Sequence, residues 1–418
     1  MSSVVPEGWV RIDLEEGVSA LISGQSPNRK ENRATGDAFG ILKTTAIDWG
    51  RFDEKQNQEV LDDYEPNNKH LVLENDILIT KAGPTHRVGV VAQARNLRSN
   101  VLLSGKMTAL RVNDRVTPDF LTYALCQEEA QNHLKANTTG MASSQTNFTH
   151  DALLRVPILS PPLSEQKKIA SILTSVDEVI ENTQKQIDKL QDLKKATMNE
   201  LLTKGIGHTE FKDSELGRIP VSWEVKKLNE LCSPTSPITY GVLKPGNYIE
   251  GGIPLLQVKD LKDGNVDKSD IHRISTSLDQ EYARSRVRFH DILISLIGTV
   301  GRVSLMPKVT ETYNIHRNIG RIRLENPEWV FLHLQSQKGV QQIQLASSGS
   351  SQSALNLSAL KEFLISIPPL MEQSDIISII NSLSESLTTN YRKLHQTQSL
   401  KKSLMQDLLT GKVRVTVN

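Results

Sequence analysis

The sequence predicts an α+β fold with an internal pseudo-two-fold repeat: two similar strand-rich α/β globular domains joined by two long antiparallel coiled-coil helices. Two observations lead to this prediction. The segment 161–166 (Pro-Pro-Leu-Ser-Glu-Gln) returns as 368–373 (Pro-Pro-Leu-Met-Glu-Gln), and each copy opens a long stretch of heptad-spaced apolar residues. The segment 193–203 has a similar copy at 400–410, at the same offset of 207 residues. A period this long indicates a duplicated domain with its helix, because solenoid units have roughly 20–50 residues.

The first part of each repeat predicts a strand-rich unit. A tryptophan three residues after a proline, Trp9 or Trp223, precedes alternating residues that suit a strand. The apolar run 77–79 returns as 292–294 and indicates a buried strand that enters a glycine-punctuated turn. An arginine follows this turn in both halves.

The second part of each repeat predicts a long helix. The 4-3 spacing over 169–201 places apolar residues at seven of ten positions, and the copy over 376–408 does the same. Such a pattern is typical of a coiled-coil seam. A proline before each start and a glycine after each end, Gly205 or Gly411, are the expected boundary signals. A helix over 163–204 would be roughly 60 Å long at 1.5 Å per residue.

Both seams are too long and regular for one face of a small domain, so we expect the two helices to pack on each other as an antiparallel pair. The globular halves would then lie at opposite ends, related by an approximate two-fold axis. The alternative is two independent helices that each dock on their own domain. The predicted parts are a first globular domain over 1–160, a central helix over 161–206, a second domain over 207–367 and a C-terminal helix over 368–412.

Composition excludes several classes of protein. The chain of 418 residues is long enough for two to three domains. Its 49 Lys and Arg nearly balance 48 Asp and Glu, so any binding of a polyanion requires local clusters. Cys126 and Cys232 are not at equivalent repeat positions and indicate ordinary thiols in a reducing compartment. Without a signal-peptide pattern or an apolar run of ~18 residues, we expect a cytoplasmic protein with no membrane segment.

Motifs of catalysis are missing from the sequence. It contains no phosphate-binding loop of the Gly-x-x-x-x-Gly-Lys-Ser/Thr type and no His-Glu-x-x-His. Asn326-Pro327-Glu328-Trp329 departs from the amino-methyltransferase motif at its second proline, and no glycine-rich cofactor loop accompanies it. We therefore expect a non-catalytic chain with no cofactor or metal of its own.

Basic residues cluster at corresponding places in the two halves. Residues 81–115 carry seven cations against one acid, and 284–323 carry eight against two, a net charge of +6 in each on a chain that is only +1. Arginine suits phosphate or the O6/N7 edge of guanine, and amides suit adenine. The candidate DNA-binding residues are Lys81, Arg87, Arg95, Arg98, Gln145, Arg302, Asn314, Arg317, Arg321 and Gln352. For any single arginine, the alternative is a solvated strand face.

Two similar basic modules at a fixed spacing predict recognition of a split double-stranded DNA sequence. Each half would dock on one segment, with uncontacted base pairs between them. The helix pair would set the spacing, between one and two turns of about 34 Å. Phosphate contacts would position the protein, and a few side chains would specify the sequence.

The order of domain, Pro-Pro-Leu-x-Glu-Gln helix, domain and second such helix resembles the specificity subunit of type I restriction-modification enzymes. Nearly the whole chain takes part in the resemblance. Pro-Glu-Gly-Trp at 6–9, Asp-Ile-Leu-Ile at 76–79 and 291–294, and Gly-Thr-Val-Gly-Arg at 298–302 are similar to recurring segments of that family. The first half departs from the pattern at 83–87 (Gly-Pro-Thr-His-Arg).

The resemblance implies that 1–160 and 207–367 are target recognition domains, each reading one half of a bipartite DNA site. It implies that the helices dock two methyltransferase subunits, that motor-nuclease restriction subunits complete the enzyme, and that S-adenosylmethionine, ATP and magnesium belong to these partners. The residues assigned to partner-binding helices are Glu165, Gln166, Lys194, Glu372, Gln373 and Lys401. Two alternatives stay open: a self-sufficient methyltransferase or nuclease, and a coiled-coil scaffold that does not read DNA.

Overall fold

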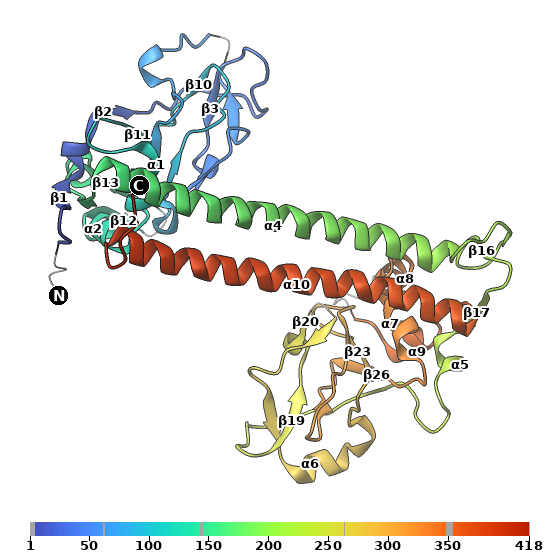
Figure 1. Ribbon diagram of the computed structural model, residues 1–418. Helices are drawn as coiled ribbons and strands as arrows, with labels where there is room; N and C mark the ends of the chain where they lie inside the picture. The colour runs from blue at the N-terminus through green and yellow to red at the C-terminus, as the bar shows by residue number, and fades with distance from the viewer. Residues whose placement is uncertain (1–4, 62, 143–144, 263, 348–353, 418) are drawn as a thin grey trace. The chain divides into compact units, whose positions relative to one another are not determined.

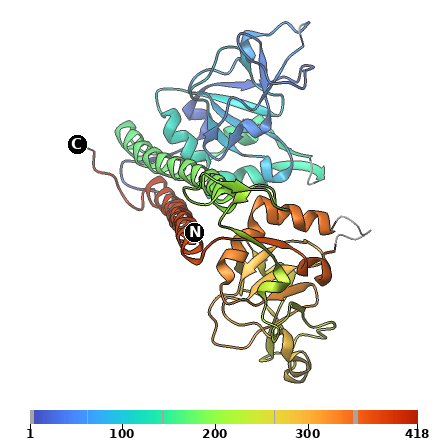
Figure 2. The ribbon, with the colours of Figure 1, turned by 90° about the vertical axis from the view of Figure 1, so that its right-hand side faces the viewer.

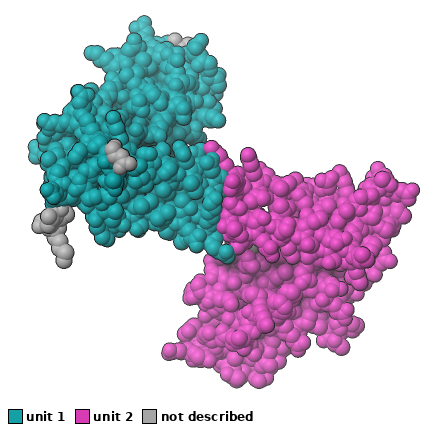
Figure 3. Space-filling view, viewed as in Figure 1, with its two compact units in different colours: residues 1–184, 392–418 teal, residues 185–391 magenta. Residues whose placement is uncertain are grey.

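The computed structural model describes residues 5–417 except 62, 143–144, 263 and 348–353. The chain forms two compact units (Figure 3). Unit 1 comprises residues 1–184 with 392–418, and unit 2 comprises 185–391. Each unit contains one globular domain and a segment of both long helices.

The two long helices form as the heptad pattern predicts. Helix α4 spans Leu163–Lys204, and helix α10 spans Leu370–Leu409. All twenty positions of the two predicted seams are buried or half-buried, whereas most of the remaining helix surface is exposed. Gly205 and Gly411 follow the helix ends with φ of +67° and +69°, a left-handed conformation that glycine adopts without a steric cost.

Within each unit the helix segments run side by side and antiparallel (Figures 1 and 2). In unit 1, Asp177 of α4 forms a 2.6 Å ion pair with Lys401 of α10. In unit 2, Gln191 of α4 donates a 2.6 Å hydrogen bond to the hydroxyl of Tyr391 of α10. The predicted antiparallel pairing is therefore confirmed inside both units.

The globular part of unit 1 contains two main sheets. The first is antiparallel, in the order β2 (Val18–Ser23), β11 (Met107–Val112), β7 (Ile77–Thr80) and β9 (Val91–Gln93). The second has the order β10 (Val101–Leu102), β3 (Gly40–Leu42) and β6 (Asn57–Glu59). Smaller sheets pair β1 (Val10–Asp13) with β14 (Pro157–Ser160), β4 (Ile47–Asp48) with β5 (Arg51–Phe52), and β12 (Thr138–Ala142) with β13 (Gln145–Phe148) and β8 (Ala82–Gly83). The helices of this part are η1 (Leu14–Gly17), η2 (Thr44–Ala46), η3 (Asn68–His70), η4 (Thr85–Arg87), α1 (Pro118–Leu125), α2 (Glu128–Ala136) and α3 (His150–Leu154).

The globular part of unit 2 repeats this plan. Its antiparallel sheet has the order β18 (Thr239–Tyr240), β26 (Ile319–Ile322), β23 (Ile292–Ser295) and β24 (Val303–Leu305). Its second sheet has the order β22 (His272–Ile274), β19 (Ile253–Leu256) and β25 (Asn314–Ile315). Smaller sheets pair β17 (Glu224–Lys227) with β27 (Leu364–Ile367), β20 (Leu261–Lys262) with β21 (Asn265–Val266), and β15 (Phe211–Lys212) with β16 (Ile219–Pro220). The helices are α5 (Leu228–Leu231), η5 (Val258–Asp260), α6 (Thr276–Glu281), η6 (Ala283–Ser285), α7 (Pro327–Gln335), α8 (Gln337–Ser347) and α9 (Leu357–Lys361).

The repeat extends to strand direction and to the core. β10 and β3 pair in parallel in unit 1, as β25 and β19 do in unit 2. The predicted strands 77–79 and 292–294 are fully buried at the centre of the antiparallel sheets. Each is preceded by a buried aspartate that binds an arginine: Asp76 binds Arg111 in the neighbouring strand β11, and Asp291 binds Arg323, which directly follows the neighbouring strand β26.

The Glu-Gln pair at the start of each long helix binds inside the chain. Glu165 accepts hydrogen bonds from Trp9 and Arg414. Glu372 accepts a hydrogen bond from Trp223, and its carboxylate lies 2.8 Å from Nε2 of His208. The side chain of Gln166 is buried and accepts from the backbone N–H of residue 117, and that of Gln373 is buried and donates to the backbone carbonyl of residue 368. The polar groups of these four side chains thus anchor each helix to its own domain, and their assignment to partner-binding helices stays a prediction.

Candidate nucleic-acid interface

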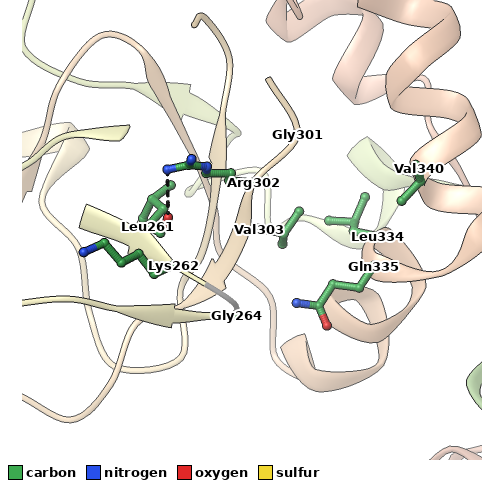
Figure 4. Close-up of a pocket in the computed structure, with 9 residues that line it drawn as sticks. All are labelled: Leu261, Lys262, Gly264, Gly301, Arg302, Val303, Leu334, Gln335 and Val340. Carbon is green, nitrogen blue, oxygen red and sulfur yellow. Dashed lines mark hydrogen bonds between the residues drawn. The ribbon is translucent and has the colours of Figure 1, made fainter. Parts of the chain in front are cut away.

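Several of the predicted DNA-binding arginines hold the scaffold together. Nη2 of Arg87 donates to the carbonyls of Thr44 (2.7 Å) and Ile47 (2.6 Å). Nη1 of Arg302 lies at the corresponding place, 3.4 Å from the carbonyl of Val258 and 3.5 Å from that of Leu261. Figure 4 shows the contact with Leu261. Each arginine therefore joins the turn after the central strand to a short hairpin, β4–β5 or β20–β21. This intrachain role, and not a contact with DNA, is the one that we propose for both arginines.

Arg95 and Arg98 of unit 1 are also engaged within the domain. Arg95 donates to the side-chain oxygen of Gln93 and pairs with Asp119. Arg98 donates to the carbonyls of residues 36 and 38, both at 3.0 Å, and lies 3.4 Å from a carboxylate oxygen of Glu54. Their guanidinium groups are committed to intrachain partners, so we no longer propose them as DNA contacts.

Two further candidates lie inside unit 2. Asn314 is 0% exposed, and its amide donates to Asp279 while its oxygen accepts from Ser285. Arg321 is 3% exposed, and burial lowers the pKa of its guanidinium, an effect that Arg323 reinforces. A buried side chain cannot reach a base edge without leaving its partners. These two predictions are therefore corrected: both side chains support the fold.

Two of the remaining candidates, Lys81 and Arg317, lie at a backbone feature found in both units, here called the crossing turn: residues 104–106 in unit 1 and 316–318 in unit 2. In unit 1, Gln25 N donates to the carbonyl of Leu103 (3.0 Å), and Gly105 N donates to the carbonyl of Gln25 (2.6 Å). Lys81 N, beyond the central strand, donates to the carbonyl of Lys106 (2.9 Å). Lys81 is thus held directly beside the crossing turn.

Unit 2 builds its crossing turn with the same hydrogen bonds. Val242 N donates to the carbonyl of Ile315 (2.8 Å), and Arg317 N donates to the carbonyl of Val242 (2.9 Å). Leu296 N donates to the carbonyl of Asn318 (2.7 Å). By these bonds Arg317 corresponds to Gly105 of unit 1.

A glycine makes each crossing possible. A Cβ on Gly24 would lie 1.9 Å from the carbonyl oxygen of Ser104, and a Cβ on Gly241 would lie 1.6 Å from that of Ile315. No side chain fits at these distances, so each position requires glycine. Neither glycine was among the predicted site residues; the available signal was a glycine directly after an early strand in each half.

Two lysines and a strand that carries exposed amides lie beside or on the crossing turn of unit 1. β13 pairs with β8, which places Asn147 opposite Ala82, the neighbour of Lys81. Gln145 and Asn147 are exposed on β13, and Lys106 is exposed on the turn itself. Partial burial, followed by the charge of Lys81, lowers the pKa of the nearby His150. The surface therefore presents fixed cations beside amide donors and acceptors.

Arginine, lysine and tyrosine surround the crossing turn of unit 2. Arg317 is exposed, as are Tyr240 and Lys244 on the segment that crosses it. The ring of Tyr248 stands edge-on to His272 at 6.1 Å between centroids. Gln352 lies outside the described residues.

The predicted partner-facing lysines of the helices are half-buried. Burial lowers the pKa of Lys194. Lys401 pairs with Asp177 and lies over the ring of Tyr123. The neighbouring leucines are the exposed residues: Leu193 is 51% exposed, and Leu400, its repeat counterpart, is 53% exposed.

The described residues contain neither a candidate metal site nor a candidate membrane-spanning helix. Within 5–417, apart from the gaps named above, no three His, Cys, Asp or Glu side chains gather as a metal site would require. In the same residues, no helix combines the length and apolarity that crossing a membrane demands.

Comparisons with known proteins agree with this architecture. The family profile of the type I restriction modification DNA specificity domain matches residues 6–192 and again 220–397. The MjaVIII specificity subunit of Methanocaldococcus jannaschii is 26% identical over 98% of this chain and 94% of its own length. The EcoBI specificity subunit of Escherichia coli is 30% identical over 67% of this chain and 62% of its own length. The solved S subunit from M. genitalium has the same fold, with a TM-score of 0.59 and 17% identity over 98% of this chain and 97% of that chain.

Proposed function

This chain belongs to the type I restriction-modification DNA specificity family, and on that premise we propose that it is the DNA sequence-recognition subunit of a type I restriction-modification complex. The observation that carries the proposal is the duplication of the crossing turn. Both units build it with the same hydrogen bonds and place different polar side chains on it. Each unit would read one half of a bipartite double-stranded site.

The chemistry of the two surfaces supports contact with DNA. The backbone of each crossing turn is held by hydrogen bonds, and the cations on it or beside it, Lys81 and Lys106 in unit 1 and Lys244 and Arg317 in unit 2, would meet phosphates or bases. Phosphate contacts position a protein on the duplex, whereas contacts to base edges specify the sequence. Amides such as Gln145 supply the second kind of contact. Under this proposal, 1–160 and 207–367 are the target recognition domains.

The long helices are proposed to dock two methyltransferase subunits. Support comes from the exposed leucines at equivalent positions, Leu193 and Leu400, because a duplicated apolar position can serve two copies of one partner. The helices with their flanks, 161–206 and 368–412, would form this assembly region. Restriction subunits would complete the complex in the cytoplasm, and S-adenosylmethionine, ATP and magnesium would bind to the partners while this chain remains non-catalytic.

The test is co-expression with the cognate methyltransferase subunit in a host free of DNA methylation, followed by long-read mapping of modified adenines. We expect a split motif with a fixed spacer. Exchanging residues 1–160 for the corresponding domain of a relative should change one half of the motif and leave the other half and the spacer intact. A continuous motif, or no motif from a soluble complex, would contradict the proposal and favour a scaffold that does not read DNA.

A further inference from the structure

We propose that Arg317 reads a guanine in the half-site of unit 2 and is a specificity-determining residue of this chain. This inference rests on the proposed function and deepens it, because it assigns one side chain to one base. It follows from what the two crossing turns share and from what they do not share.

The two units share their scaffold side chains. The aspartate before the central strand, Asp76 or Asp291, binds an arginine in the neighbouring strand or directly after it in both units. The arginine after that strand, Arg87 or Arg302, donates to the carbonyls of the short hairpin in both units. Since these residues recur with their contacts, they account for the common frame and not for any difference in recognition.

The crossing turn keeps its backbone and changes its side chains. Unit 1 has Ser104, Gly105 and Lys106, and unit 2 has His316, Arg317 and Asn318 at the corresponding positions. Arg317 therefore stands where unit 1 has no side chain at all. A position that differs on an otherwise duplicated frame is where two halves that read different sequences are expected to diverge.

The backbone beneath Arg317 is held on several sides. Its own N–H donates to the carbonyl of Val242, and the N–H of His316 donates to the carbonyl of Leu256 (2.9 Å). The buried amide of Asn314 accepts from the N–H of Ile315 (2.9 Å), which fixes the strand that leads into the turn. Because this backbone is already ordered, a side chain attached to it can contact DNA with little additional loss of backbone entropy on binding.

The guanidinium of Arg317 is free, in contrast to those of its neighbours. It is exposed and makes no hydrogen bond or ion pair with any residue that the structure describes. Arg286 and Arg323, by comparison, bind Asp279 and Asp291. A free, exposed fork on a fixed backbone matches the bidentate contact that arginine makes with O6 and N7 of guanine.

The test is selection of bound duplexes from a randomised library by the full-length chain, carried out with wild type and with Arg317→Ala, Arg317→Lys and Arg317→Gln. Lys308→Ala is the matched control for the loss of one charge. Lys308 follows β24 at the end of the sheet away from the crossing turn, since Ile292 pairs with Leu305 whereas Ser295 pairs with Ile319. Circular dichroism and thermal unfolding of each variant verify the fold.

We expect wild type and Lys308→Ala to enrich the same split motif, with a guanine in one half. Arg317→Ala should lower the preference for that guanine about 10–100-fold and leave the other half unchanged. Arg317→Gln should move the preference at this position toward adenine, because glutamine pairs with N6 and N7 of adenine. Arg317→Lys should keep the overall affinity and lose part of the discrimination, since it retains the charge without the fork.

Two outcomes would overturn the inference and leave the proposed function standing. One is an unchanged motif in Arg317→Ala. The other is an even loss of affinity for all sequences with a salt dependence shallower by about one ion, which would make Arg317 a phosphate contact. If wild type itself enriches no motif, the proposed function fails and the inference fails with it.

Discussion

The indole Nε1 of Trp223 donates a 3.0 Å hydrogen bond to Oε2 of Glu372, and it thereby ties the residue before β17 to the first turn of α10. The same carboxylate binds the ring of His208 at 2.8 Å and accepts from the N–H of Ile206 at 3.0 Å. Both of these residues lie just past the end of α4. One side chain therefore joins a domain, the start of one long helix and the end of the other.

Unit 1 builds the same junction with one different member. Trp9 Nε1 donates to Glu165 Oε2 at 3.3 Å, and Arg414, which lies three residues past Gly411, donates to both oxygens of Glu165. Bonding to Arg414 lowers the pKa of this carboxyl, and the bond from Trp9 adds to the effect. The charged guanidinium takes the place that His208 has in unit 2.

We predict that Trp223→Phe destabilises the chain more than Trp9→Phe does. In unit 2 the loss of the indole removes a principal donor to a mostly buried carboxylate and leaves space in the core, at a cost of about 2–4 kcal/mol. In unit 1 the two bonds from Arg414 still satisfy Glu165, so the cost should be about half of that. Urea unfolding followed by far-ultraviolet circular dichroism measures both. Equal losses would show that the junction carboxylates do not depend on their indoles.

We predict that Arg302→Ala lowers the stability of unit 2 and leaves the salt dependence of DNA binding unchanged. Its guanidinium holds carbonyls of the short hairpin, and unpairing buried carbonyls costs about 1–3 kcal/mol. The measurements are the free energy of unfolding and the slope of binding affinity against salt concentration. Arg87→Ala is the matched variant in unit 1, where the bonds are shorter and the loss should be larger. If the variant is as stable as wild type and its slope of log affinity against log salt concentration is smaller by about one, Arg302 contacts DNA.

A third prediction concerns the pH dependence of stability. His333 is buried, and this burial lowers its pKa to about 4, while its Nε2 bonds to the carbonyl of Leu364. Because the pKa is lower in the folded state, this histidine favours folding above its unfolded pKa of about 6.5, and stability falls as the pH drops. Between pH 6.5 and 5 the loss should be about 1.5 kcal/mol.

The control for this prediction is His333→Gln, which keeps a donor without a titrating ring. The measurement is the midpoint of urea unfolding at pH 7, 6.5, 6, 5.5 and 5. The variant should show a flatter profile than wild type over this window, although it is less stable at pH 7. Parallel profiles would mean that His333 does not set the acid sensitivity of unit 2.

The helices could be predicted from the sequence because the residue patterns that specify them are local. Heptad spacing and a boundary glycine such as Gly205 act within a few turns of one segment, and they determine where α4 begins and ends. Repetition of the segment then predicts a second helix of the same kind. Pairing of the helices followed from their unsatisfied apolar seams.

The site could be predicted only in part, because a count of charges does not show what each charge touches. Arg87 and Arg317 look alike in the sequence, yet one guanidinium is bonded to backbone carbonyls and the other is free. The crossing turn itself joins Gln25 to Leu103 and Gly105, residues about eighty positions apart, through backbone hydrogen bonds that do not depend on residue type. No periodic pattern reports such a contact.

The last prediction concerns assembly. Leu193→Ser together with Leu400→Ser should weaken binding of the methyltransferase subunit at least tenfold and leave the fold intact, because both side chains are about half exposed and lie outside the seam. The single variants should each remove one of two docking positions. Native mass spectrometry of the co-expressed complex would then show one bound methyltransferase in place of two.

The matched control is Lys195→Ser with Lys402→Ser, exposed repeat positions that point to other sides of the helices. If the leucine double variant still binds two methyltransferase subunits at full affinity, the docking surface lies elsewhere on the chain. Loss of helical circular dichroism would instead assign the two leucines to the coiled coil itself.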